Sequence, residues 1–137
     1  MIVADANMLV AIWVQGDFSK TSLSILNKER EWIAPILWRS EFRSALRKYL
    51  KANIIDSTNA NRMMSEALNL MQNREYSVDS YSVIELISKT TISAYDAEYV
   101  ALAQETGSRL VTFDKKLIDL FPEVAIHPED FLDAASS

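Results

Sequence analysis

Short apolar segments alternate with longer amphipathic segments along most of the chain, and this alternation constrains the fold most. The apolar runs at residues 1–5, 32–35 and 109–113 have the length of buried strands. Weaker strand signals occupy residues 76–80 and 123–127. Strands that alternate with helices form a parallel sheet covered by helices. We therefore expect an α/β fold whose central parallel sheet has about four to five short strands flanked by helices.

Helical periodicity fills the intervals between these strands. Asp56 has the position of an N-cap, and Gly107 has the position of a helix stop. The expected helices occupy residues 6–14, 18–31, 37–53, 57–75, 80–90, 93–107 and 114–121.

The composition excludes several classes of active site. With 137 residues, of which 49% are hydrophobic, the chain is expected to form a single domain, residues 1–137. Its 2 glycines lie far apart, so no glycine-rich phosphate loop can form. The absence of Cys excludes thiolate metal sites, and the single His127 excludes a pair of catalytic histidines in one chain. We interpret His127 as a structural or surface residue.

The net charge of −5 gives no basic footprint for nucleic acid, but bound metal ions can reverse the sign of an acidic cleft. No apolar run approaches the roughly 20 residues that span a bilayer. The N-terminal segment has no basic stretch before its apolar residues, so it does not resemble a signal peptide. We expect a cytoplasmic protein without a membrane segment.

Two acids lie where expected strands end. Asp5 follows the first strand and Asp114 closes the segment at 109–113. Ligands collect at the carboxyl ends of parallel strands, which favours a functional site. Each acid also fits the role of a helix N-cap, and both interpretations stay open. The nearby Asn7 and Thr112 fit either supporting groups of a site or ordinary turn residues.

Two further acids lie on expected helices. On a helical wheel, Asp96 lies within about 60° of three apolar-face residues, Tyr99, Val100 and Ala103. It is therefore expected on the inward face of its helix. A buried charge there is costly unless it is compensated, although Ser93 and Asp96 also match a capping box. Glu41 lies about 70° from the centre of its helix's apolar face and has no basic residue at helical spacing. It therefore needs a tertiary partner or a function.

As a set, Asp5, Glu41, Asp96 and Asp114 would repel one another if they met at one site. Ligand sets made only of oxygen suit Mg²⁺ or Mn²⁺, which retain several waters and accept phosphate as a further ligand. The set thus favours a divalent-metal site.

The segments "IVADANMLV", "APILWRSEFRSAL", "SAYDAEYVALA" and "RLVTFD" resemble the PIN domain, and most closely the VapC-type toxins of toxin–antitoxin pairs. The resemblance covers nearly the whole chain. It implies a PIN-like sandwich with an acidic Mg²⁺ or Mn²⁺ pocket that cuts RNA, usually single-stranded, leaving 5′-phosphate and 3′-hydroxyl ends. It makes Asp5, Glu41, Asp96 and Asp114 the catalytic metal ligands, and Asn7 and Thr112 their supporting residues.

The same resemblance implies three kinds of partner: RNA as substrate, a cognate antitoxin, and a second copy of the chain in a homodimer. Promoter DNA would be reached only through the antitoxin. A catalytically silent module that serves as corepressor or scaffold is the alternative, but the intact acids disfavour it. A glycosidase would not need four acids. A receiver domain needs two adjacent acids after its first strand, and Asp5 precedes Ala6.

A basic stripe follows one expected helix and suggests an RNA track. It centres about 150° from the apolar face and about 140° from Glu41, so we interpret it as a solvated outer face. The Trp and Met residues are interpreted mainly as core, with a dimer or antitoxin groove as the alternative. The stripe consists of Arg39, Arg43, Arg47 and Lys51, and the core set of Trp13, Trp32, Trp38, Met63, Met64 and Met71.

Overall fold

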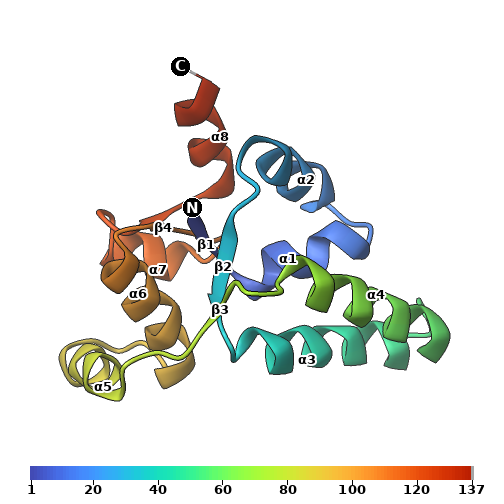
Figure 1. Ribbon diagram of the computed structural model, residues 1–137, viewed down its shortest axis with the longest axis horizontal. Helices are drawn as coiled ribbons and strands as arrows, with labels where there is room; N and C mark the ends of the chain where they lie inside the picture. Colours follow the sequence, from blue (N-terminus) through green and yellow to red (C-terminus); the bar gives the residue numbers. More distant parts are fainter. Residues whose placement is uncertain (137) are drawn as a thin grey trace.

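The computed structural model describes residues 1–136 and contains the expected parallel sheet (Figure 1). Its five strands are arranged in the order β3-β2-β1-β4-β5, and every neighbouring pair is parallel. The predicted α/β fold is therefore confirmed. The strands are β1 (Ile2–Ala4), β2 (Trp32–Pro35), β3 (Glu75–Tyr76), β4 (Arg109–Val111) and β5 (Ala125–Ile126).

Helices cover both sides of this sheet. In Figure 1, α5, α6 and α7 lie to its left, whereas α1 to α4 lie to its right. The paired helices α3 and α4 extend side by side, and α8 packs against α2. The helices are α1 (Ala6–Trp13), α2 (Ser19–Lys28), α3 (Trp38–Lys51), α4 (Ser57–Leu70), α5 (Ser80–Lys89), α6 (Ala94–Thr106), α7 (Lys115–Leu120) and α8 (Pro128–Ser136).

Several element boundaries differ from the expectation. Strand β4 ends at Val111, because the Thr112 hydroxyl accepts the Asp114 N–H at 3.0 Å and turns the chain towards α7. The strand expected at 76–80 lies instead at residues 75 and 76, since Asp79 caps α5. Helix α8 was not expected; its first turn carries acidic side chains, which favour a helix N-terminus.

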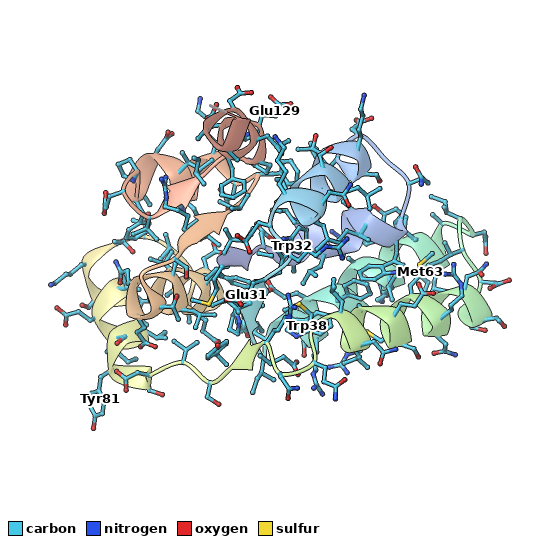
Figure 2. The ribbon with its side chains drawn as sticks, turned by 45° about the horizontal axis from the view of Figure 1, so that its top comes forward. Glu31, Trp32, Trp38, Met63, Tyr81 and Glu129 are labelled. Carbon is cyan, nitrogen blue, oxygen red and sulfur yellow. The ribbon has the colours of Figure 1, made fainter. Side chains whose placement is uncertain are left out.

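The core fills the space on both faces of the sheet. Trp32, Trp38 and Met71 are fully buried, and Met63 lies between α3 and α4 (Figure 2). The interpretation of the Trp and Met residues as mainly core is thus confirmed, with Trp13 and Met64 only partly buried. None of the helices in the described chain is long and apolar enough to cross a membrane.

Helix α6 corrects one detail of the sequence analysis. We expected a single inward face, but six of its residues are buried and they surround the axis, because α6 packs against both α5 and the sheet. Asp96 is half-buried near its N-terminus, and Glu98, expected to point outwards, is also half-buried. The buried residues are Ala97, Tyr99, Val100, Ala101, Leu102 and Ala103.

Candidate functional site

The pairing of β1 with β4 places two polar side chains next to each other at the carboxyl edge of the sheet. Ala4 is in register with Val111, so the residues that follow them, Asp5 and Thr112, are neighbours. The Thr112 hydroxyl donates to Asp5 Oδ2 at 2.5 Å, across 107 positions of sequence. Because the same hydroxyl accepts the Asp114 N–H, Thr112 connects the first and last acids of the predicted set.

Asp5 and Asp114 both cap helices, as the alternative interpretation held. Asp5 Oδ1 accepts the Asn7 N–H at 3.0 Å at the start of α1. Asp114 Oδ1 accepts two N–H groups of the first turn of α7, those of Lys116 at 2.9 Å and Leu117 at 3.4 Å. Capping fixes the direction of each carboxylate. It does not exclude a functional role, because Asp114 Oδ2 makes no hydrogen bond within the described chain.

The supporting residues differ in how they act. Thr112 is fully buried and uses its side chain, as described above. Asn7 contributes its backbone N–H to Asp5, while its side chain is exposed.

Glu41 has a tertiary partner that the sequence analysis did not identify. The buried hydroxyl of Tyr99 donates to Glu41 Oε1 at 2.6 Å. This bond joins α3 to α6 and fixes one oxygen of a half-buried carboxylate. A phenol supplies a hydrogen bond but no positive charge, so the carboxylate's charge is not neutralised.

Asp96 occupies the first turn of α6. The Ser93 hydroxyl accepts the Asp96 N–H at 3.0 Å, so the spacing predicted for a capping box does place a cap at the start of this helix. Burial raises the pKa of the Asp96 carboxyl above its ordinary value, and repulsion from Asp114 adds to the rise. The hydrogen bond with Ser93 and the charge of Lys116 act in the opposite direction.

Burial and neighbouring negative charges also act on the carboxyls of Asp5 and Glu41. Burial raises the pKa of Asp5 despite its hydrogen bonds, and the charges of Asp96 and Asp114 raise it further. Burial also raises the pKa of Glu41, with additional repulsion from Asp5 and Asp96. The four acids therefore act on one another electrostatically, as groups that share one site do.

The donor groups of these residues fit the coordination chemistry of a divalent ion. Carboxylate oxygens, backed by hydrogen bonds from Thr112, Tyr99 and backbone N–H groups, suit Mg²⁺ or Mn²⁺. Among residues 1–136, no three acidic or His side chains are grouped closely enough to hold an ion between them as they stand. A metal would thus be bound through fewer direct protein ligands together with water, which is usual for Mg²⁺.

Two residues of this region escaped the sequence analysis. Tyr99 was assigned to the apolar face of α6, although its spacing from Asp96 would place a hydroxyl on the same side. Glu98 lies near Glu41, and burial raises the pKa of the Glu98 carboxyl. It is a fifth acid at the margin of the group.

Two interpretations outside the acid group are confirmed. His127 is structural: its Nδ1 accepts the Glu129 N–H at 3.1 Å, and its ring packs edge-on against Phe113. The basic stripe on α3 is exposed, as expected for a solvated face. One member, Arg39, also forms a bidentate salt bridge with Glu75.

A parallel α/β sheet with acids at the carboxyl ends of its strands defines a class of proteins that bind ligands at that edge. Within that class, the PIN domain family matches residues 2–125, and the chain belongs to this family.

The similar proteins agree with this assignment. The chain is 28% identical over 127 residues to "Ribonuclease VapC3" of Pyrobaculum aerophilum, covering 88% of this chain and 95% of the relative. It is 31% identical over 124 residues to "Ribonuclease VapC9" of Mycobacterium tuberculosis, covering 87% and 90%. The crystal structure of PAE2754 from Pyrobaculum aerophilum superposes with a TM-score of 0.76, at 22% identity, over 99% of this chain and 98% of that one. That likeness concerns the fold.

Proposed function

We propose that the protein is a Mg²⁺- or Mn²⁺-dependent endoribonuclease and the toxin of a toxin–antitoxin pair. The observation that carries the proposal is the group of four mutually repelling acids at the sheet edge. Three of them have raised pKa values, a condition that a bound cation would relieve. The relatives named VapC ribonucleases support RNA as the substrate.

The acids have distinct proposed roles. Asp5 and Asp96 would bind the metal directly, and Glu41 and Asp114 would complete its surroundings, partly through water. Thr112 and Tyr99 hold the carboxylates of Asp5 and Glu41. A divalent ion bound there supplies an activated water and neutralises charge on the phosphate.

Incubation of the purified protein with single-stranded RNA tests this function. We expect cleavage with Mg²⁺ or Mn²⁺, none with chelator, and recovery when the metal is restored. Product ends with 5′-phosphate would support hydrolysis by an activated water. Cleavage that persists undiminished in chelator would contradict the metal mechanism, and a lack of cleavage with either metal would contradict the enzyme.

The proposal includes a homodimer and a small antitoxin as partners, with DNA reached only through the antitoxin, in the cytoplasm. Helix α5 supports a protein contact, because it has no fully buried residue and exposes Tyr81 by 86% and Ile84 by 59%. Co-expression with the protein encoded by the neighbouring gene, followed by size-exclusion chromatography with light scattering, tests both partners. A monomer that elutes without its neighbour would contradict this part.

A further inference from the structure

A cavity of about 370 Å³ adjoins the acid group and has no assigned role. It lies between α1, the loop that leads into α2, and one face of α3. Asn7, whose N–H holds Asp5, and Phe113, the neighbour of Asp114, both line it. Two residues thus belong to the cavity wall and directly adjoin acids of the site, so a ligand bound at the acids has this cavity beside it.

The cavity contains an aromatic stack. The rings of Phe18 and Phe113 lie 4.0 Å apart between centroids at an angle of 28°, and His127 packs edge-on against Phe113 at 5.6 Å. Phe18 is the outer member of the stack and remains 50% exposed. An exposed ring supported from behind is a surface on which an unpaired nucleobase stacks.

The cavity also carries a cation that the basic stripe does not include. Lys48 follows Glu41 by seven positions on α3, about 20° round the helix and about 10 Å along it. It therefore faces the same way as the candidate site, unlike the centre of the stripe, and it makes no salt bridge within the described chain. Asp17 is the other charged residue of the lining. The cavity is neutral overall, which suits an uncharged base, while Lys48 suits an RNA phosphate.

We propose that this cavity binds a nucleotide of single-stranded RNA next to the cleaved bond, with its base on Phe18 and a backbone phosphate at Lys48. The inference rests on the proposed function, because it takes RNA as the substrate at the acids. It adds a place for the base, which the acids themselves do not recognise. It also explains why an apolar ring stays exposed beside an anionic centre.

Binding without cleavage tests the proposal. In an Asp96→Asn background without metal, fluorescence anisotropy would measure the affinity for a labelled single-stranded RNA of mixed sequence and for the same RNA with abasic riboses. Phe18→Leu keeps an apolar side chain but removes the ring, so we expect about fivefold weaker binding of intact RNA. Binding of abasic RNA should not change. Tyr81→Leu, which removes an exposed ring from distant α5, is the matched control (Figure 2).

The phosphate contact has its own test. Lys48→Gln should reduce the slope of log affinity against log salt by about 0.7, the value for one phosphate contact on a single strand. Arg43→Gln, on the solvated stripe about 140° from Lys48 round the same helix, should leave that slope unchanged.

Four results would overturn the proposal. The first is no measurable RNA binding by the Asp96→Asn parent, and the second is equal RNA affinity of the Phe18→Leu and Tyr81→Leu variants. The third is a loss of affinity in Phe18→Leu that is equal for intact and abasic RNA. The fourth is a salt slope that Lys48→Gln leaves unchanged. If Phe18→Leu weakened only a complex with the antitoxin, the cavity would be a protein-binding surface instead. Failure of the enzyme proposal is read separately, as absence of metal-dependent cleavage by the wild-type protein.

Discussion

Glu75 and Glu41 each accept a hydrogen bond from an aromatic side chain, but their surroundings are otherwise opposite. Trp38 Nε1 donates to Glu75 at 2.7 Å, and the Tyr99 hydroxyl donates to Glu41 at 2.6 Å. Glu75 also receives two 2.6 Å bonds from Arg39, and this pairing lowers the pKa of its carboxyl. Its charge is thus satisfied by the protein itself.

Glu41 is surrounded by like charges instead. Burial raises the pKa of its carboxyl, and the charges of Asp5, Asp96 and Glu98 act in the same direction. No Lys or Arg in the described chain forms a salt bridge with it. The comparison teaches that the charge of Glu75 is paired within the chain, whereas Glu41 has no cationic partner there; under the proposed function, a bound metal ion would supply that positive charge.

The largest expected effect comes from removing one of the repelling charges. Asp96→Asn should lower metal-dependent cleavage by more than about 100-fold, because loss of a direct metal ligand exceeds the usual cost of losing an outer-shell contact. Its metal-free melting temperature should equal or exceed that of the wild type, since repulsion with Asp114 disappears. Cleavage assays with metal and thermal melts without metal measure the two effects.

A pure capping role gives a different result for the same variant. Ser93 is the N-cap of α6 and is unchanged in this variant, so Asn at position 96 loses only the charge term of a first-turn acid, about 0.3–1 kcal/mol. Wild-type cleavage with a slightly lower melting temperature would show that Asp96 serves only the helix.

Tyr99→Phe sharpens the comparison at Glu41, because it removes the hydroxyl and leaves the ring in the core. We expect cleavage to fall about tenfold and the metal concentration for half-maximal activity to rise, since Tyr99 positions Glu41 without touching the metal. Tyr95→Phe, on the same helix and 62% exposed, is the control. Equal metal dependence in both variants would limit Tyr99 to packing.

Glu75→Gln instead removes a carboxylate whose charge is already paired, with Arg39. The variant loses the charge pairing with Arg39, so the melting temperature should fall by a few degrees while cleavage is retained. Differential scanning calorimetry and the RNA assay measure these outcomes. A strong loss of cleavage in a folded variant would mean that the two regions are coupled through α3.

The smallest effect concerns pH. The pKa values of Asp5, Glu41 and Asp96 are raised in the folded state, so protonation of these groups stabilises the fold, and that stabilisation is lost as pH rises through their folded pKa values. Relative to Asp96→Asn, the metal-free wild type should gain thermal stability as the pH falls from neutral towards the raised pKa of the Asp96 carboxyl. Melts of both proteins at matched ionic strength test this, and parallel pH profiles would contradict it. Added Mg²⁺ at neutral pH should replace the lost stability in the wild type.

The sequence predicted the sheet and most helices because their signals are local. Hydrophobic runs and helical periodicity need only a few neighbouring residues to be recognised. The short strands β3 and β5 have two residues each, so their boundaries depend on pairing with β2 and β4 rather than on their own pattern. The unpredicted α8 is likewise stabilised by its contact with α2.

The same distinction holds for the site. The positions of Asp5 and Asp114 at the carboxyl edge of the sheet could be predicted, because strand ends are visible in the sequence. The hydrogen bond between Tyr99 and Glu41 joins residues 58 positions apart, and no local sequence pattern predicts it. The stack of Phe18 on Phe113 depends equally on how distant loops meet. Long-range contacts of this kind decide which acids and aromatics become neighbours.

The hydrogen bond between Thr112 and Asp5 also limits how early the site can form during synthesis of the chain. The ribosome makes Asp5 almost at once, but its partner comes 107 positions later. Contacts so distant in sequence form late, because the ends of a long loop must first be brought together. A nascent chain that stops before β4 has neither Thr112 nor Asp114, and so it lacks the proposed catalytic centre. Under the proposed function, a nascent chain would therefore gain ribonuclease activity only once most of its residues have been made.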